Sequence, residues 1–430
     1  MDSPVDQIHL IIIGGGIAGL SSAISTCIAG HRCTILEQAQ DFKEVGAGVQ
    51  LTPNGTRILA QWGLLEKLAP CAAAPESLTI LRYDGSRILS HESGWQKKMT
   101  SAYNAPFWNV HRADLQSAML QKARELGVKI CTGARVQDID FDCAYVVLAD
   151  TKEVVRGDAI LAADGLWSQA RSLILQKPAA PILTGDLAYR ITLRLEELTQ
   201  CPELIEWVSN PRVTFWIGPD AHAVGYSLRA GKEFNLVLLC PDNLPELCNR
   251  TSGDLSEMVE RFKDWDSTLL KFLSCVKRVD KWRLMHYPCL ENWNGKHGFL
   301  TMAGDSCHPM LPYLAQGANS AMEDGAVLGR LLGSARSAED IPLVLETYQK
   351  LRRERVREIS EHSLNQRTSF HLPDGPLQEA RDKALAEGES VAGDFPSRWT
   401  CPIVQPWLYG YDATAEAEKA IHGIRLLGQM

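Results

Sequence analysis

The first forty residues alternate between apolar runs and a segment rich in glycine. Residues 8–13 form a continuous β-branched and apolar run, which predicts a buried parallel strand. A helical pattern follows over residues 21–29, and residues 31–36 predict a second strand that Glu37 closes. The turn between the first strand and the helix reads Gly14-Gly15-Gly16-Ile17-Ala18-Gly19, so the order is that of a βαβ unit.

This glycine turn is suited to the pyrophosphate of a dinucleotide. Gly14 permits the tight turn, Gly16 lets the backbone approach the phosphates, and Gly19 lets the helix pack close to the strand. The helix N-terminus adds unpaired N–H groups and a positive dipole end. Glu37, 18 residues after Gly19, is placed to accept hydrogen bonds from the adenosine ribose, which favours FAD or NAD over NADP as the bound dinucleotide. The alternative, a turn that binds nothing, fits poorly with the strand, helix, second strand and acid in register.

Two later apolar runs also end in an acid next to a glycine. Residues 158–163 lead into Asp164-Gly165, and residues 298–303 lead into Gly304-Asp305, so both predict buried strands. An acid at a strand end is often only a helix cap, and for Asp164 that alternative stays open.

A further helix is expected to begin at Gly317-Ala318. Pro309 and Pro312 keep the preceding chain out of a helix, so the helix can begin sharply. If the bound dinucleotide is FAD, the N–H groups of this helix would be suited to the edge of the flavin ring that becomes negative on reduction, because helix N-termini stabilise anions.

The middle of the chain has a different pattern. Alternating runs at 213–217, 223–228 and 234–239 are separated by turn residues and predict an antiparallel sheet with one face buried. Residues 79–83 and 87–89 predict one more hairpin through Asp84-Gly85.

Composition narrows the class of protein. Of 430 residues, 45% are apolar and 22% charged, which is ordinary for a globular protein, and the net charge of −8 gives no indication of nucleic-acid binding. Arg352, Arg353, Arg355 and Arg357 alternate with glutamates, which predicts a solvated helix face. The twelve cysteines lack zinc-ligand spacing, so no metal site is predicted, and scattered thiols fit a reducing, cytoplasmic location. No apolar run is long enough for a membrane span.

The glycine turn and the two glycine-acid motifs together resemble the single-component (group A) FAD-dependent aromatic hydroxylases, within them the salicylate-hydroxylase-like branch. Further matching stretches are Glu44-Val45-Gly46-Ala47-Gly48-Val49-Gln50, Pro53-Asn54-Gly55, His111-Arg112-Ala113-Asp114-Leu115 and residues 185–190. Residues 407–412 resemble the tail of fungal members.

The resemblance implies roles for individual residues. Asp305 would bind the ribityl or ribose part of FAD, and Arg112 its phosphate or ribityl region. Gly48 would let the chain pass close to the isoalloxazine, and Asp164 would lie near the pyrophosphate and serve nicotinamide binding. Arg112 as a plain surface ion-pair partner is the alternative.

Two polar side chains are candidate substrate anchors in the apolar pocket that an aromatic ligand needs. Arg190 would hold a phenolate or carboxylate by a charge-assisted bond, and Tyr226 would position the same oxygen. For Tyr226, a strand tyrosine packed at a sheet surface is an equal alternative.

The resemblance also implies a fold. It is an α/β fold, p-hydroxybenzoate-hydroxylase-like, with an FAD-binding Rossmann-like domain, a mixed antiparallel-sheet substrate domain and C-terminal helices. We expect the FAD-binding domain to be discontinuous over 1–75, 105–180 and 286–360. The substrate domain would comprise 76–104 and 181–285, and the C-terminal helical region 361–430.

The expected activity is that of an FAD-dependent monooxygenase. NADH or NADPH, bound transiently, would reduce a tightly but non-covalently bound FAD. Dioxygen would then give a flavin C4a-hydroperoxide that inserts one oxygen atom into an electron-rich aromatic, phenolic or polyketide- or indole-like, in secondary metabolism. The alternatives are a flavin-dependent oxidoreductase without oxygen transfer and a non-enzymatic FAD-binding sensor. A flavin halogenase is disfavoured because no Trp-x-Trp segment occurs. Substrate identity and oligomeric state stay open.

Overall fold

The computed structural model describes residues 7–42, 47–140 and 143–426. Residues 44–46, part of the stretch that carries the family resemblance, therefore lie outside the described residues. Within the described chain, none of the helices has the length and apolar character that crossing a bilayer requires.

A five-stranded parallel sheet carries the dinucleotide turn. Its order is β18-β11-β1-β2-β7, with β18 at Leu300–Met302, β11 at Ala159–Ala162, β1 at His9–Ile13, β2 at Arg32–Leu36 and β7 at Lys129–Cys131. The strands β1 and β11 are almost wholly buried, because helices cover both faces. The glycine turn and both glycine-acid motifs follow strands of this sheet, so they meet at its carboxyl edge.

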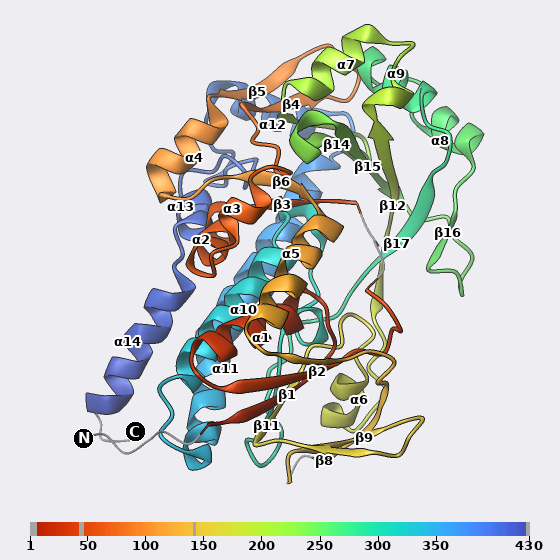
Figure 1. Ribbon diagram of the computed structural model, residues 1–430. Helices are drawn as coiled ribbons and strands as arrows, with labels where there is room; N and C mark the ends of the chain where they lie inside the picture. Colours follow the sequence, from red (N-terminus) through yellow and green to blue (C-terminus); the bar gives the residue numbers. More distant parts are fainter. Residues whose placement is uncertain (1–6, 43–46, 141–142, 427–430) are drawn as a thin grey trace.

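A second, eight-stranded sheet faces this edge (Figure 1). Its order is β16 (Arg250–Ser252), β17 (Asp280–His286), β12 (Ile182–Arg194), β15 (Glu233–Pro241), β14 (Ala221–Leu228), β13 (Arg212–Gly218), β4 (Ser77–Arg82) and β5 (Ile88–Ser93). The predicted hairpin is confirmed as β4–β5, but β4 pairs with β13 in parallel. The expectation of one buried face is wrong for the central strands, because β13 and β14 are buried on both faces.

The two faces of this sheet have different partners. On one face, Trp216 and Phe234 of the sheet pack in a cluster with residues of α7, α8 and α9, among them Phe272 of α9. The other face contributes Phe215 and Tyr226 to a cluster with residues from the C-terminal part of the chain, and it lines the main cavity.

Helices connect and cover the sheets. They are α1 (Ile17–Ile28), α2 (Pro53–Gln61), α3 (Leu65–Leu68), α4 (Trp95–Tyr103), α5 (Arg112–Glu125), α6 (Gln169–Leu175), α7 (Pro202–Ser209), α8 (Leu255–Arg261), α9 (Ser267–Ser274), α10 (Gly317–Leu332), α11 (Ile341–Phe370), α12 (Pro376–Glu387), α13 (Val404–Tyr409) and α14 (Ala413–Leu426). The predicted first helix begins four residues earlier than expected, at Ile17, because the last glycine of the turn already lies in its first turn.

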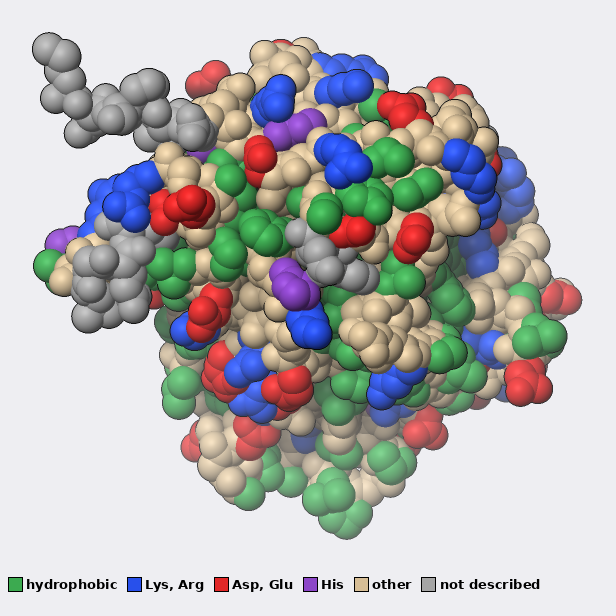
Figure 2. Space-filling model, turned by 90° about the horizontal axis from the view of Figure 1, so that it is seen from below, with side chains coloured by type: hydrophobic (Ala, Val, Ile, Leu, Met, Phe, Trp, Pro, Cys, Tyr) green, Lys and Arg blue, Asp and Glu red, His purple; other side chains and the backbone are tan. Residues whose placement is uncertain are grey.

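The remaining elements are short. A three-stranded sheet has the order β10 (Val154–Arg156), β9 (Tyr145–Leu148), β8 (Val136–Asp140), and β3 (Gly48–Leu51) pairs with β6 (Trp108–His111). The 3-10 turns are η1 (Leu195–Glu197), η2 (Arg229–Gly231), η3 (Gly304–Ser306), η4 (Pro312–Leu314) and η5 (Ala338–Asp340). The helical C-terminal part is confirmed, and α11 runs without a break through residue 360. On the face drawn in Figure 2, acidic and basic side chains are interspersed.

Candidate active site

The glycine turn leaves open space beside the start of α1. A Cβ at Gly14, where φ is +103°, would lie 2.4 Å from the carbonyl oxygen of Ala163, and one at Gly19 would lie 2.0 Å from that of Gly14. A Cβ at Gly16 would meet nothing within 4 Å. Gly14 and Gly19 are therefore needed for packing, whereas Gly16 faces the cavity. No side chain caps α1, so its first N–H groups are available to an anion.

Glu37 closes β2 and supports the same turn. Its carboxylate accepts hydrogen bonds from the backbone N–H of Gly15 at 2.7 Å and of Ala39 at 2.8 Å. Glu37 also lines an extension of the cavity of about 400 Å³ together with Arg135, Asp164 and Trp167. This extension shares Gly16, Ala163 and Gly165 with the main cavity.

Asp164 lies at the end of β11, where one of its oxygens caps a helix. Oδ2 accepts from the backbone N–H of Ala170 in α6 at 3.1 Å, so the capping alternative describes this oxygen. Oδ1 is buried and has no hydrogen-bond partner among the described residues. Burial raises the pKa of Asp164, with hydrogen bonds from Ser168 and the α6 backbone opposing the rise. An unpartnered buried carboxylate oxygen marks a place for a ligand hydroxyl or water.

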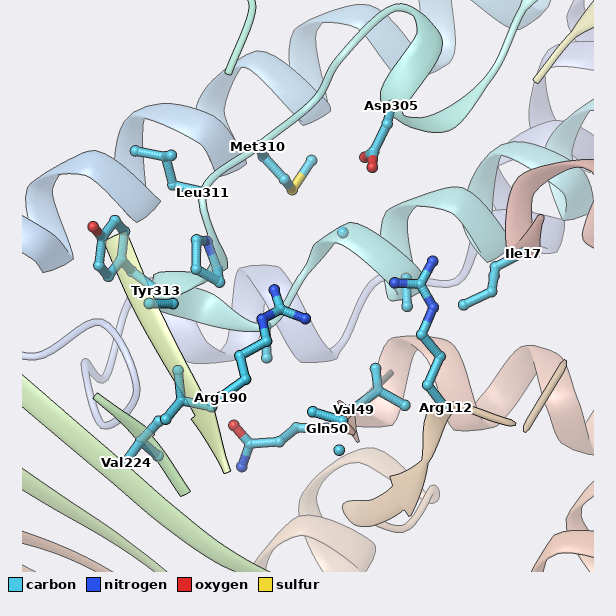
Figure 3. A pocket seen from close by; sticks show the side chains of 18 of the residues that line it. Ile17, Val49, Gln50, Arg112, Arg190, Val224, Asp305, Met310, Leu311 and Tyr313 are labelled. Carbon is cyan, nitrogen blue, oxygen red and sulfur yellow. The ribbon is translucent and has the colours of Figure 1, made fainter. Parts of the chain in front are cut away.

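Asp305 and Arg112 face each other across the main cavity (Figure 3). Asp305 follows β18 in η3, and its solvent-accessible side chain lines the cavity. Burial raises the pKa of Asp305, and the positive charges of Arg112 and Arg171 oppose this. Arg112 is the first residue of α5, and its guanidinium makes no hydrogen bond to any described residue.

The start of α10 also opens into the cavity. Gln316 precedes the helix without a side-chain cap, Gly317 and Ala318 line the cavity, and a Cβ at Gly317 would meet nothing within 4 Å. Four groups suited to an extended dinucleotide therefore follow one channel: open backbone at Gly16, the Glu37 extension, the Asp305–Arg112 pair and a 16-residue helix N-terminus. The residues present fit FAD.

The group that lies close to the Gly48 backbone is the side chain of a tyrosine. A Cβ there would lie 2.5 Å from the ring of Tyr226, and the Gly48 N–H donates to Asn235 Oδ1 at 2.9 Å. Tyr226 is 5% exposed and lines the cavity from β14. Burial raises its pKa, while Arg190 and Asn235 favour its ionised form.

Arg190 projects from β12 into the cavity, as Figure 3 shows. Its guanidinium stacks on the indole of Trp282, 4.6 Å from the ring centroid. Its Nε is buried, and within the described chain the guanidinium has no hydrogen bond or ion pair. Burial, followed by the charge of Arg112, lowers its pKa. Because arginine stays charged in proteins, this is a half-buried cation that lacks an anion within the described chain.

A buried ion network positions the Asp305 loop, and the sequence analysis missed it. Arg352 contacts Glu323 and Asp324 at 2.8 Å each, with all three side chains fully buried, and Arg355 also pairs with Glu323. The prediction of a solvated face is therefore wrong for Arg352 and Arg355, although Arg353 is partly exposed and Arg357 is exposed.

Asp324 connects this network to the loop. It accepts hydrogen bonds from the Gly304 N–H at 2.9 Å and from His308 at 2.6 Å. Burial alone would raise its pKa, but His308 and Arg352 more than offset this and hold it at about 2.

The main cavity, of about 310 Å³, is within the range of small-molecule sites. Its far end is mainly apolar and aromatic, with walls from both the sheet and the C-terminal part of the chain: Ala188, Phe215, His222, Val224, Val237, Leu239, Met310, Leu311, Tyr313 and Trp399. Sequence reasoning missed His222, Tyr313 and Trp399, and no local motif marks Trp399.

The fold and this channel define a flavin-dependent enzyme, and comparison with known proteins gives the family. Residues 7–363 match the model of the FAD binding domain family, and the chain belongs to it. It is 59% identical to FAD-dependent monooxygenase OpS4 of Beauveria bassiana (strain ARSEF 2860), over 99% of this chain and 100% of that one.

More distant matches extend over equally long stretches. The chain is 34% identical to 3-amino-4-hydroxybenzoate 2-monooxygenase PtnB3 of Streptomyces platensis, over 94% of this chain and 96% of that one. A solved structure of CtdE in complex with FAD and substrate shares the fold, with a TM-score of 0.84 and 21% identity over 99% and 100% of the two chains. The protein is an FAD-dependent, hydroxylating monooxygenase that uses NAD(P)H and O2. The oxidoreductase without oxygen transfer and the sensor are thereby set aside.

Proposed function

We propose that this monooxygenase hydroxylates a small electron-rich aromatic compound that carries an acidic oxygen, a phenol or phenolic acid, and that Arg190 binds this oxygen. The observation that carries the proposal is the unpaired guanidinium of Arg190 inside a mainly apolar cavity. A half-buried charge that faces a cavity without a partner is partly desolvated, and a ligand oxyanion would compensate that loss. The 3-amino-4-hydroxybenzoate named for the Streptomyces relative is a compound of this class.

Sheet register supports a shared role for Arg190 and Tyr226. Arg190 pairs with Val237 and Val237 with Val224, while Tyr226 is two residues along β14 from Val224. Both side chains therefore project from the same face of the sheet into the cavity. We therefore propose that Tyr226 forms a second hydrogen bond to the substrate oxygen that Arg190 binds.

We further propose how the chain holds FAD. The turn containing Gly14, Gly16, Ala18 and Gly19 would take the pyrophosphate, Glu37 the adenosine ribose, and Asp164 a nearby hydroxyl. Arg112 and Asp305 would bind the phosphate-to-ribityl region. Gly317 and Ala318 would donate to the ring edge, and Gly48, beside Tyr226, would border the ring.

The chain's own part in the reaction is to bind, orient and exclude water. Bound FAD supplies the redox chemistry, taking electrons from NAD(P)H and passing them to O2. Arg190 favours the ionised phenol, which makes the ring more nucleophilic, and the apolar wall around it keeps bulk water away from the reacting carbon. We propose residues 76–104 and 181–285 as the substrate domain, residues 1–75, 105–180 and 286–360 as the FAD-binding domain, and 361–430 as the helical region.

The test compares two arginines that stack on the same indole. Arg190→Ala removes the cation inside the cavity. Arg250→Ala removes an exposed cation whose guanidinium lies 4.3 Å from the centroid of the same Trp282 ring and pairs with Asp280. We expect Arg190→Ala to raise the Kd for a phenolic ligand roughly 10- to 100-fold, as loss of a charge-assisted bond does. It should also uncouple NAD(P)H oxidation from hydroxylation, with H2O2 replacing product.

Arg250→Ala should keep near-normal coupling. Equal product yield per NAD(P)H in the Arg190 variant and the unsubstituted enzyme would remove Arg190 from the substrate site.

A further inference from the structure

The floor of the substrate cavity is a row of side chains that crosses four strands of the eight-stranded sheet. Arg190 on β12 pairs with Val237 on β15. Val237 pairs in turn with Val224 on β14, and Val224 pairs with Phe215 on β13. Directly paired residues share one face of a sheet, and all four line the cavity. The row therefore runs from a guanidinium across two valines to an aromatic ring, roughly 14 Å between the Cα atoms at its ends.

Trp399 closes the end of this row that lies away from Arg190. Its indole packs on the ring of Phe215, with centroids 5.3 Å apart, and it lines the cavity while being 2% exposed. Trp399 lies in the connection between α12 and α13, and among the described residues that follow α10 it alone lines the main cavity. A separate segment of the chain thus supplies the wall opposite the arginine.

Hydrogen bonds hold the indole of Trp399 in this orientation. Its Nε1 donates to the carbonyl oxygen of Tyr313 at 3.1 Å, and the carbonyl oxygen of Trp399 accepts from Nε2 of Gln405 at 2.6 Å. Tyr313 is fixed as well, because its hydroxyl donates to Asp186 at 2.5 Å. Since displacing the indole would break a buried hydrogen bond, this wall resists a ligand that is longer than the cavity.

A second tryptophan of the same apolar cluster shows what packing alone requires. Trp95 is 1% exposed and packs on Phe107 with centroids 5.9 Å apart, and Trp399 packs on the same ring at 6.4 Å. Among the described residues, Nε1 of Trp95 has no hydrogen-bond partner, and Trp95 does not line the main cavity. Trp95 therefore fills the core, whereas Trp399 presents an oriented indole to a ligand.

The space left for a substrate is short. The main cavity of about 310 Å³ also includes Gly48 and Gly317, beside which the flavin ring of the proposed FAD site would lie. The substrate then has the part above Val237 and Val224, which is two strands or roughly 10 Å wide. This part suits one six-membered ring whose oxygen binds Arg190. A second ring fused at the opposite edge would extend along the row into the tryptophan indole.

We propose that Trp399 sets the size limit of the substrate and restricts this enzyme to phenols and phenolic acids with one aromatic ring. Replacing the indole by a methyl group would lengthen the cavity by a space on the order of 150 Å³, the size of an engineered cavity that accepts benzene. The inference rests on the proposed binding of an acidic oxygen by Arg190, and it adds the length of the ring system that this binding allows.

The test compares the binding of two matched pairs of ligands to the oxidised holoenzyme. One pair is 2-hydroxybenzoate and 3-hydroxy-2-naphthoate, and the other is catechol and 2,3-dihydroxynaphthalene. In each pair the second compound adds a ring fused at the edge opposite the oxygens. Titrations followed by flavin absorbance give the Kd values. The unsubstituted enzyme should bind each single-ring compound roughly 10-fold or more tightly than its fused counterpart, because the added ring meets the indole.

Trp399→Ala should reverse this preference. The fused compounds should gain roughly 10-fold or more in affinity because they refill the vacated space, while the single-ring compounds should lose affinity a few-fold. Trp399→Leu fills part of the space and perturbs folding less, so it should give an intermediate ratio of Kd values. Product formed per NAD(P)H should follow the same order, with H2O2 replacing product for the poorly bound member of each pair.

Trp95→Ala is the matched control. It removes an indole from the same cluster without lengthening the cavity, so it should lower the thermal midpoint as Trp399→Ala does but keep the preference for single-ring compounds. The FAD content of each variant verifies that the cofactor site is intact. A purely structural role of Trp399 would leave the ratio of Kd values alike in the two alanine variants.

The outcomes separate the size limit from the function on which it rests. Fused compounds that bind the unsubstituted enzyme as tightly as their single-ring counterparts, or more tightly, would overturn the size limit. An unchanged ratio of Kd values in both Trp399→Ala and Trp399→Leu would also overturn it, and both results leave binding at Arg190 intact. Failure of all four compounds to bind the unsubstituted enzyme at any pH would overturn both proposals.

Discussion

Replacing Arg352 by methionine tests the buried ion network that supports the Asp305 loop. Arg352 is fully buried and pairs with Glu323 and Asp324 at 2.8 Å each. Methionine fills much of the same space without the charge, so the main loss is electrostatic. Removing one partner from a buried ion network costs about 3–5 kcal/mol, because the remaining charges are left uncompensated.

The remaining contacts place the expected cost at the lower end of that range. Glu323 keeps Arg355 at 2.8 Å, and Asp324 keeps His308 and the Gly304 N–H. We therefore expect Arg352→Met to lower the free energy of unfolding by about 3 kcal/mol at neutral pH, measured by urea denaturation of the holoenzyme.

The pH dependence gives an independent check on this reasoning. The folded-state pKa of Asp324, about 2, is below the unfolded value, so its contribution to stability is present above about pH 4 and is lost as the pH falls towards 2. Arg352→Met should raise the pKa of Asp324 in the folded protein. The difference in unfolding free energy between the unsubstituted enzyme and the variant should therefore become smaller as the pH falls from about 4 towards 2.

The neighbouring Arg353 is the control. It is 41% exposed, and its partner Glu291 is 91% exposed at 3.6 Å. Arg353→Met should therefore change the unfolding free energy by at most about 1 kcal/mol. Equal losses of unfolding free energy in Arg352→Met and Arg353→Met would refute the account of the network. So would a difference in unfolding free energy between Arg352→Met and the unsubstituted enzyme that does not depend on pH.

Two further predictions concern FAD. Asp305→Ala should fold but lose FAD, seen as colourless protein with an unchanged far-UV spectrum, and stoichiometric FAD in this variant would exclude the assigned role. Gly16→Ala should leave the stability of the apoprotein unchanged, because a Cβ there meets nothing within 4 Å, yet weaken FAD binding by occupying the phosphate space. Titration of apoprotein with FAD measures this, and undiminished affinity would show that the phosphates lie elsewhere.

Local patterns predicted those elements whose structure depends on nearby residues. The βαβ unit, the hairpin at Asp84-Gly85 and the central strands lie within a few residues of their predicted positions, because period and turn chemistry define them. The parallel pairing of β13 with β4 could not be predicted, since its paired residues, such as Arg212 and Ser77, are 135 positions apart.

The helical period of the sequence indicates the burial of Arg352 and Arg355, although their alternation with glutamates obscures it. Along α11 the positions of Leu345, Tyr348, Arg352 and Arg355 recur every three or four residues on the buried face. The helical period thus places both arginines on the apolar side, opposite the buried acids of α10. Alternation with glutamate by itself predicts a solvated face. Only the helical period shows that Arg352 and Arg355 lie on the buried side.

The far end of the cavity was the least predictable part. Trp399 reaches it from the C-terminal region and donates its indole N–H to the Tyr313 carbonyl at 3.1 Å. His222 and His371, 149 positions apart, meet only in the folded chain. No motif or spacing connects such residues, because tertiary packing alone brings them together.

The most direct test of the central claim uses isotopically labelled dioxygen. Holoenzyme with NAD(P)H is supplied with a panel of phenols and phenolic acids and, as a matched set, the same rings with the acidic oxygens methylated. The account predicts that an acidic phenol gains one labelled oxygen atom per NAD(P)H oxidised, and that its methylated counterpart gives mainly H2O2. Equal label in both sets, or NAD(P)H oxidation without label in any product, would contradict it.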